Sequence, residues 1–217
     1  MTLDERDGPD TDPGGAYVLA EPGFTIIRDL LGNGSTVLDI GCGHGNVGAF
    51  LGEAGMVVDG IEPDEERAAV AAQVLHHVCT APLADAVGSP ELRATYDAVT
   101  MIDVVEHVVR PTEALEQAAT FMDGASRLLL FVPNSAHWSF RSKVLRGDWS
   151  YADRGLFDRT HLRFFDLATA SALGPSAGLV ETRRWATTPG PSLTSRHGPR
   201  LRPNLFALHF LFELRKP

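Results

Sequence analysis

Short apolar runs and segments of helical composition alternate along the chain. Short apolar runs rich in β-branched residues predict strands, and they occur at 36–40, 56–61, 126–132, 179–185 and 206–214. Segments of helical composition lie among them, at 17–31, 46–54, 64–75 and 112–121, with a further helix beginning near Asp166. Strands that alternate with helices predict an α/β protein with a doubly wound, mostly parallel sheet.

Several of these helices have predictable ends. Gly55 terminates the second helix, and an acidic cluster from Asp64 onward suits the start of the third. Thr112 is the predicted N-cap of a helix that reaches Phe121. Pro22 is expected to interrupt the first helix.

The first strand leads directly into a glycine-rich turn and then a helix. Gly41, Gly43 and Gly45 stand at alternate positions, where the backbone can adopt positive φ and admit a ligand closely. Asp39 precedes this turn by two residues. Glu62 follows the second strand, 23 positions beyond Asp39, where a carboxylate can accept hydrogen bonds from a ribose diol.

This turn suits a cationic ligand better than a pyrophosphate. A nicotinamide fingerprint would require glycine at position 46, which is Asn46 here, and Asp39 would repel the phosphates. A nicotinamide-dependent oxidoreductase is therefore the less favoured, rival hypothesis. S-adenosylmethionine (SAM) carries an ammonium and a sulfonium, both of which a carboxylate favours.

Two segments resemble the class I SAM-dependent methyltransferases. The first is Asp39-Ile40-Gly41-Cys42-Gly43-His44-Gly45, which matches the family's Asp-x-Gly-x-Gly-x-Gly motif, and the second is 96–108, which is similar to its fourth strand and post-strand segment. The resemblance extends over roughly 15–217. It implies a Rossmann-like methyltransferase fold with a seven-stranded sheet, an antiparallel last strand, and SAM as the cofactor.

The resemblance also implies a cofactor site. The turn would line the methionine end, Glu62 would hold the ribose, and Met101 or Ile102 would pack beside the cofactor. The third strand lies near 78–80, and no acidic residue follows it at once, so the adenine position stays open between Thr80 and Asp85. The full expected set is Asp39, Gly41, Cys42, Gly43, Glu62, Pro63, Thr80, Met101 and Ile102.

Two histidines are candidates for removing the acceptor's proton. His107 follows the fourth strand, at the edge where ligands bind in open α/β sheets, and His161 lies in a segment that resembles one found in natural-product and glycan-pathway methyltransferases. Both imidazoles can titrate near neutrality. The alternative interpretation is that His161 is a hydrogen-bonded scaffold residue.

The same residues resemble a metal-binding set. Asp103, Glu106, His107 and the later His161 are similar to the Glu-x-x-Glu-His and His ligands of small-RNA 2′-O-methyltransferases, and ubiquinone-biosynthesis O-methyltransferases share a related pattern. Such a set can hold a divalent ion that orients an acceptor hydroxyl and lowers its pKa. Asp103 is one methylene shorter than the Glu that it replaces. Glu106 and His107 could instead brace the loop.

About thirty residues between the fifth strand and Asp166 form an insertion that the sheet does not need, which is typical of a functional segment. It is rich in aromatic and basic side chains, namely Trp138, Phe140, Trp149, Tyr151 and Phe157 among Arg141, Lys143, Arg146, Arg154, Arg159 and Arg163. These residue types suit a flat, anionic acceptor. They also occur in nucleic-acid sites, which the acidic chain disfavours.

Charge is divided unevenly along the chain. Residues 1–123 carry 5 basic and 22 acidic side chains, a balance of −17, whereas 124–217 carry 14 basic and 6 acidic ones, a balance of +8. A basic second half is consistent with an anionic acceptor. The alternative is that the two halves neutralise each other across the fold.

The composition fits one globular domain, since 44% of the 217 residues are apolar and 22% are charged. We expect a flexible acidic arm at 1–15 and a methyltransferase domain at 16–217. Cys42 and Cys79 are too few for a disulfide framework. Because no signal-peptide run or membrane span is evident, the expected location is the cytoplasm.

The sequence therefore predicts a SAM-dependent methyltransferase that acts on a hydroxyl of a small molecule, such as a natural product, sugar or quinone. The alternatives are a divalent-metal-assisted 2′-O-methyltransferase of RNA and a non-catalytic SAM-binding module.

Overall fold

The computed structural model describes residues 22–152, 155, 157–190 and 193–217. The predicted arm at 1–15 and the first part of the predicted helix at 17–31 lie outside these residues. Seven strands are present: β1 (Thr36–Ile40), β2 (Val57–Ile61), β3 (His77–Cys79), β4 (Ala98–Ile102), β5 (Arg127–Pro133), β6 (Val180–Thr187) and β7 (His209–Arg215).

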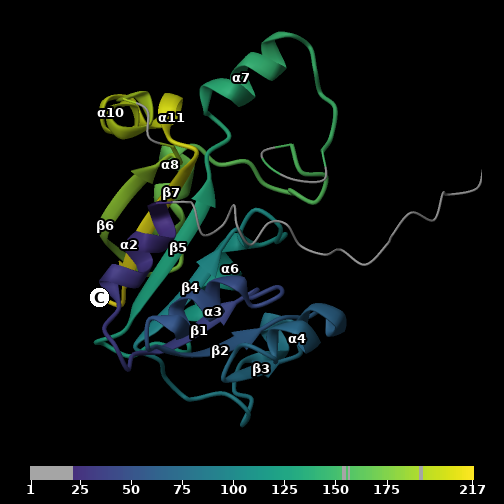
Figure 1. Cartoon of the computed structure of the whole chain (residues 1–217), viewed down its shortest axis with the longest axis vertical. Coiled ribbons are helices and arrows are strands. Elements are labelled where there is room, and N and C mark those ends of the chain that lie inside the picture. Colours follow the sequence, from purple (N-terminus) through teal and green to yellow (C-terminus); the bar gives the residue numbers. More distant parts are fainter. Residues whose placement is uncertain (1–21, 153–154, 156, 191–192) are drawn as a thin grey trace, which may run out of the picture.

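The strands form one sheet in the order β3-β2-β1-β4-β5-β7-β6 (Figure 1). β1 to β5 pair in parallel, and β7 runs antiparallel to both β5 and β6. This arrangement confirms the predicted doubly wound, mostly parallel sheet and its antiparallel last strand. The strand order reverses beside β1, so the first crevice at the carboxyl edge opens between β1 and β4.

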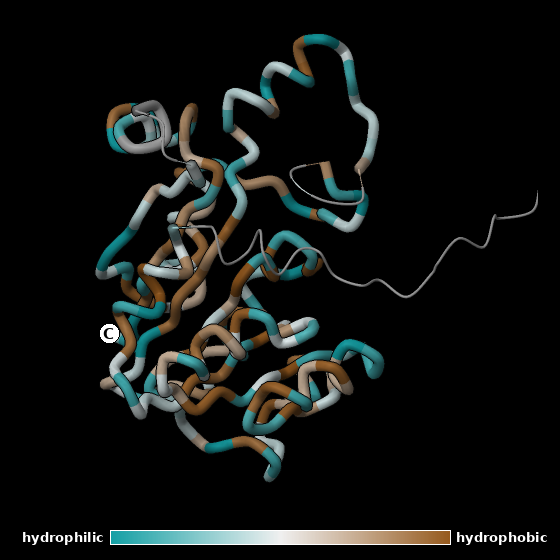
Figure 2. The backbone as a smooth tube through the Cα atoms, viewed as in Figure 1, coloured by the Kyte–Doolittle hydropathy of each residue, from teal (hydrophilic) through white to brown (hydrophobic). Residues whose placement is uncertain are grey.

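Helices cover both faces of the sheet. The described helices are α2 (Pro22–Leu30), α3 (Asn46–Glu53), α4 (Glu65–Ala71), α5 (Leu83–Ala86), α6 (Pro111–Ala119), α7 (Trp138–Leu145), α8 (Leu167–Ser171), α9 (Leu173–Ser176), α10 (Leu193–Leu201) and α11 (Pro203–Phe206). Residues of α2, α3 and α4 pack on one face, whereas those of α5, α6, α8 and α9 pack on the other. Hydrophobic residues accordingly concentrate along the central strands (Figure 2).

One helix end differs from the predictions. The predicted N-cap at Thr112 is wrong, because the helix begins at Pro111 with Arg110 at the capping position. Proline is well tolerated at the start of a helix, where a backbone N–H would have no helical partner. The described part of α2 begins at Pro22 and the residues before it lie outside the described ones, so the interruption expected there stays a prediction.

Helices α5, α7, α10 and α11 were not predicted. α5 is a short helix after β3, α7 lies within the insertion after β5, and α10 and α11 fill the connection between β6 and β7, so the last strand begins at His209 and not at Phe206. Figure 1 shows α7, α10 and α11 beyond the upper end of β5. None of the described helices is long and apolar enough to cross a membrane.

A buried carboxylate braces β2, the strand that ends next to Glu62. Asp59 accepts hydrogen bonds from the Tyr96 hydroxyl and from Nδ1 of His76, both at 2.8 Å. Arg93 lies 3.4 Å away. Since Asp59 and Tyr96 are both buried, this network ties β2 to the segment that leads into β4.

Replacing Tyr96 with Phe should lower the free energy of unfolding by about 1–2 kcal/mol, because a buried carboxylate loses one of its donors. Tyr151→Phe is the matched control, since that side chain is exposed. Urea denaturation measures both variants. Equal midpoints for the two would contradict a bracing role for Asp59.

Candidate functional site

The glycine turn after β1 has the backbone that the sequence predicts. Gly41, Gly43 and Gly45 have φ values of 71°, 55° and 83°, which side chains disfavour. The N–H groups of Gly41 and Cys42 donate to the Ile61 carbonyl at 2.8 and 3.1 Å. A Cβ at Gly41 would lie 2.8 Å from a methyl group of Val104, so the turn lies close to the segment after β4.

Glu62 fastens this turn to the end of β2. Its Oε2 accepts the N–H of Gly43 at 2.9 Å and its Oε1 accepts the N–H of Asp64 at 3.0 Å. The carboxylate is almost completely buried. Because each carboxylate oxygen can accept two hydrogen bonds, Glu62 keeps acceptor capacity for a ligand hydroxyl.

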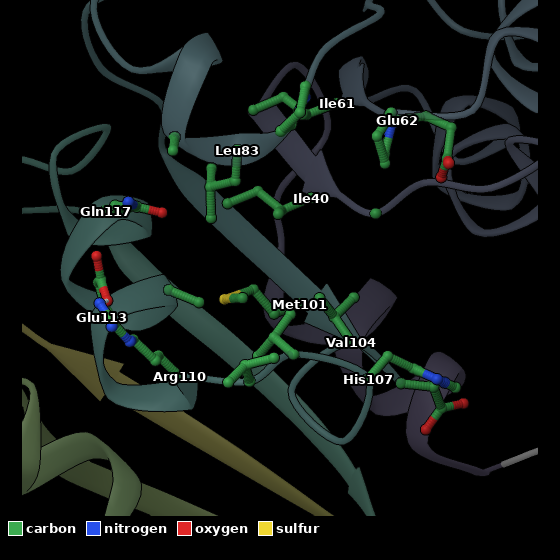
Figure 3. A pocket seen from close by; sticks show the side chains of 18 of the residues that line it. Ile40, Ile61, Glu62, Leu83, Met101, Val104, His107, Arg110, Glu113 and Gln117 are labelled. Carbon is green, nitrogen blue, oxygen red and sulfur yellow. Dashed lines mark hydrogen bonds and ion pairs between the residues drawn. The ribbon is translucent and has the colours of Figure 1, made fainter. Parts of the chain in front are cut away.

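A cavity of about 790 Å³ opens beside these residues. It lies at the carboxyl ends of β1, β2 and β4 and extends to α6 (Figure 3). Its wall is made of Ile40, Gly41, Ile61, Glu62, Pro63, Arg67, Pro82, Leu83, Ala84, Met101, Asp103, Val104, His107, Val108, Val109, Arg110, Glu113, Ala114, Gln117 and Thr160.

Asp39 lies behind this wall. Its side chain is 2% exposed and accepts a hydrogen bond of 2.6 Å from Thr100 Oγ1. Burial raises the pKa of Asp39 to about 6; the bond from Thr100 opposes the shift and the charge of Glu62 adds to it. An ionised Asp39 therefore creates a negative potential that would attract a nearby cation.

The predicted cofactor residues are placed in different ways. Gly41, Glu62, Pro63 and Met101 line the cavity. Ile102 packs against the opposite face of the sheet, in the cluster that contains α2, because successive strand residues point to opposite sides.

Gly43, Cys42 and Thr80 are not among the residues in the cavity wall. Gly43 contributes its N–H to Glu62. Cys42 is buried against Gly60, where an added Cβ would lie 2.6 Å from its sulfur. Burial raises the pKa of its thiol, and the charges of Asp39 and Glu62 add to the shift. Thr80 is exposed after β3.

Sequence reasoning missed the part of the wall that comes from α5 and α6. Arg110, Glu113 and Gln117 follow one another at intervals of three and four residues, so they share one face at the start and along the length of α6. That spacing was visible in the sequence. Its functional meaning was not, because it depends on α6 lying beside Leu83.

The two predicted histidines lie together with Glu106. One potential ligand atom from each of Glu106, His107 and His161 lies within 4.8 Å of the others, and the two imidazole rings are 4.8 Å apart between centroids. The backbone N–H groups of Leu162 and Arg163 donate to the Glu106 carbonyl at 2.8 and 3.0 Å. The insertion is thus attached to the segment after β4.

Thr160 orients His107. Its carbonyl oxygen lies 3.2 Å from Nδ1 of His107, and its hydroxyl donates to Asp158 at 2.6 Å. Because a carbonyl only accepts, neutral His107 carries its proton on Nδ1 and has Nε2 as an acceptor. Burial opposes ionisation of Asp158, but the Thr160 hydrogen bonds and the two histidines hold its pKa below the usual value.

Glu106 is the exceptional member of this group. It is 1% exposed, and within the described part of the chain neither carboxylate oxygen has a hydrogen-bond partner. Burial, and then the charge of Asp103, raise the pKa of Glu106 well above its ordinary value. An orphaned buried carboxylate beside two imidazoles fits the donor chemistry of a divalent-ion site.

Asp103, the fourth residue of the predicted metal set, is not part of this group. It has a left-handed backbone, with φ of 51°, and lines the cavity that Glu62 also lines. The structure therefore brings together three of the four predicted ligands.

The sheet order, the glycine turn and the carboxylate at the end of β2 define a class I methyltransferase fold. Residues 20–180 match the sequence profile of a methyltransferase domain family. The chain belongs to this family.

Curated relatives are similar over part of their length. A ubiquinone biosynthesis O-methyltransferase of Aeromonas salmonicida (strain A449) is 26% identical over 157 residues, which cover 68% of this chain and 63% of that protein. One from Shewanella halifaxensis (strain HAW-EB4) is 33% identical over 92 residues, which cover 40% of this chain and 38% of that protein. The matches thus span less than two thirds of either relative.

Solved structures confirm the fold. A SAM-dependent methyltransferase from Archaeoglobus fulgidus aligns with a TM-score of 0.65 at 17% identity, covering 93% of this chain and 99% of that one. The magnesium protoporphyrin IX methyltransferase of Synechocystis PCC 6803 with bound S-adenosylhomocysteine (SAH) aligns with a TM-score of 0.60 at 19% identity, covering 99% and 90%.

The raised pKa of Asp39 predicts pH-dependent binding of SAM. Below about pH 6 the buried carboxyl is protonated, and above it the carboxylate is ionised. A cationic sulfonium favours the ionised form, so the preference for SAM over uncharged-sulfur SAH should rise as pH increases through 6.

Calorimetry between pH 5 and 8 measures that preference. In Asp39→Asn it should be roughly tenfold smaller above pH 6 and independent of pH. Asp29→Asn is the control, because Asp29 is an exposed residue of α2. A variant at position 39 that kept the wild-type pH profile would show that Asp39 does not sense the cofactor charge.

Proposed function

We propose that this protein transfers the methyl group of SAM to a hydroxyl of a small-molecule acceptor of natural-product, sugar or quinone type. One observation carries this proposal: His107 and Thr160 line the same cavity as Glu62 and Met101. A group that can take a proton and the groups suited to the cofactor therefore share one site. Two O-methyltransferase relatives, at low identity, support the same acceptor class.

Gly41, Gly43 and Glu62 are the proposed cofactor contacts. The positive-φ turn admits the methionine end of SAM, and Glu62 accepts hydrogen bonds from the ribose. Asp39 contributes through its charge, since its side chain lies behind the wall. Met101 supplies apolar contact.

The chemistry is an in-line displacement. The acceptor oxygen forms a bond to the methyl carbon while the bond from that carbon to the sulfonium breaks, which leaves neutral SAH. The hydroxyl proton passes to Nε2 of His107 or to His161. Alignment and proton removal are the main demands of such a reaction, and the contact between His107 and Thr160 meets the first by fixing the imidazole.

Binding of a divalent ion is the second candidate function for the cluster of Glu106, His107 and His161. The Glu106 carboxylate favours it, because neither of its oxygens has a hydrogen-bond partner among the described residues. Glu106, His107 and His161 would hold the ion. When bound, it would orient the acceptor hydroxyl and lower its pKa.

The insertion is the proposed cover of an anionic acceptor. Phe140 and Phe157 stack with their centroids 4.5 Å apart, and Lys143 lies 4.1 Å from the Phe157 centroid. These three residues stabilise the insertion itself. Trp149 and Tyr151 are exposed and can contact an acceptor. Arg154 lies outside the described residues.

His161→Asn should lower kcat by roughly 10²- to 10⁴-fold, the contribution of a positioned proton acceptor, while the Kd for SAH stays unchanged. His197→Asn is the control, because His197 is an exposed residue of α10. SAH release is followed with 3,4-dihydroxybenzoate and with glucose as acceptors. No turnover of either acceptor by the wild type would contradict the proposal, whereas full activity of His161→Asn would assign proton removal to His107 alone.

Metal dependence is tested by treating the protein with EDTA and then restoring Mg²⁺, Mn²⁺ or Zn²⁺. If an ion is held, EDTA should lower turnover at least roughly tenfold, as expected for lost metal assistance, and Glu106→Gln should abolish Mn²⁺ binding in calorimetry. Glu116→Gln, at an exposed position, should bind as the wild type does. Turnover that is insensitive to EDTA would leave the imidazoles as the base alone.

A further inference from the structure

The cavity has a polar wall at the end that lies away from His107. Figure 3 shows Gln117, Glu113 and Arg110 on one side of the cavity, and Glu62 and His107 on the opposite side. All three end-wall residues belong to α6 or its capping position. The proposed mechanism gives this wall no role.

The space between the two sides is apolar. Ile40, Leu83 and Met101 lie there (Figure 3), and Val108 and Ala114 also line the cavity. Aliphatic and thioether side chains suit contact with the faces of a planar ring. A flat heterocycle in this space would direct one edge at α6.

The shape of SAM identifies that ring. On the proposed placement, Glu62 binds the ribose and the sulfonium is directed to His107. The adenine base would then occupy the α6 end of the cavity. This step rests on the proposed function.

The usual source of adenine contacts, the segment after β3, offers little here. Thr80 is exposed after β3 and is not part of the cavity wall. Asp85, the nearest acidic residue, is exposed and is not among the described wall residues either. That segment contributes apolar Pro82, Leu83 and Ala84 to the wall.

Donor and acceptor chemistry selects one residue of the polar wall. The edge of adenine that carries the N6 amino group presents a donor next to a ring-nitrogen acceptor. Arg110 can only donate, Glu113 can only accept, and the two are already paired at 3.1 Å. The Gln117 amide offers both a donor and an acceptor, the combination that pairs with adenine through two hydrogen bonds.

We propose that Gln117 binds the N6 edge of the SAM adenine and sets the base specificity of the cofactor site. Glu113 lies one helical turn before it and is held by Arg110, so the ion pair borders the position of the base. Recognition of adenine thus comes from the helix after β4 in this chain.

Calorimetry with SAH and with its analogue that lacks the N6 amino group tests this proposal. The wild type should bind SAH at least about fivefold more tightly than the analogue. In Gln117→Leu, SAH should bind roughly 5- to 150-fold more weakly than in the wild type, and the preference should fall to about one. Leu and Gln have similar volume and helix propensity.

Glu116→Leu is the matched control, since Glu116 precedes Gln117 on α6 and is exposed. It should keep the wild-type affinity and preference. The proposal is overturned if Gln117→Leu binds SAH as the wild type does, or if it weakens both ligands equally, because an equal loss indicates a structural role.

Glu62→Ala separates this proposal from the proposed function. If the wild type binds SAH and Glu62→Ala weakens it while Gln117→Leu does not, only the role of Gln117 fails. If the wild type does not bind SAH at all, the cofactor placement fails as well, and both are overturned.

Discussion

The two hydrogen bonds that the Glu62 carboxylate accepts, from the N–H groups of Gly43 and Asp64, hold the cavity in shape. They join the turn after β1 to the end of β2, and the Ile61 carbonyl reinforces the junction through Gly41. Both bonds are made by backbone N–H groups, so they fix the path of the chain at this corner of the cavity. The positive φ of the glycines is the local condition for this arrangement, since a Cβ at Gly41 would collide with Val104.

Negative charge gathers at this one edge of the sheet. Asp39, Glu62, Asp103 and Glu106 all lie at or just beyond strand ends, and two of them have raised pKa values with burial as the main cause. Such a concentration is unfavourable for phosphate groups and favourable for cations. On the proposed placement of the cofactor, the sulfonium of SAM would meet that requirement near Asp39. A divalent ion held by Glu106, His107 and His161 would meet it near Glu106.

The sequence predicts the sheet and the glycine turn well, because β1, α3 and β2 have strong local signals: β-branched runs, a glycine at each sharp bend, and the right order. It fails where the outcome depends on neighbours. α7 lies in a segment whose aromatic and basic residues have no helical period. Ile102 was expected beside the cofactor, but strand alternation turns it away from Met101. Gln117 could not be recognised because its place in the wall requires contact between helices that are distant in sequence.

Asp103 lies between the cavity and the histidine cluster in its influence, because it lines the first and its charge acts on the second. Its left-handed backbone, which aspartate tolerates better than most residues, turns the chain directly after β4. The carboxylate therefore lines the cavity and does not join Glu106, His107 and His161. Its charge nevertheless contributes to the raised pKa of Glu106. Asp103 therefore acts on the cluster through its charge, whereas His107 belongs both to the cavity wall and to the cluster.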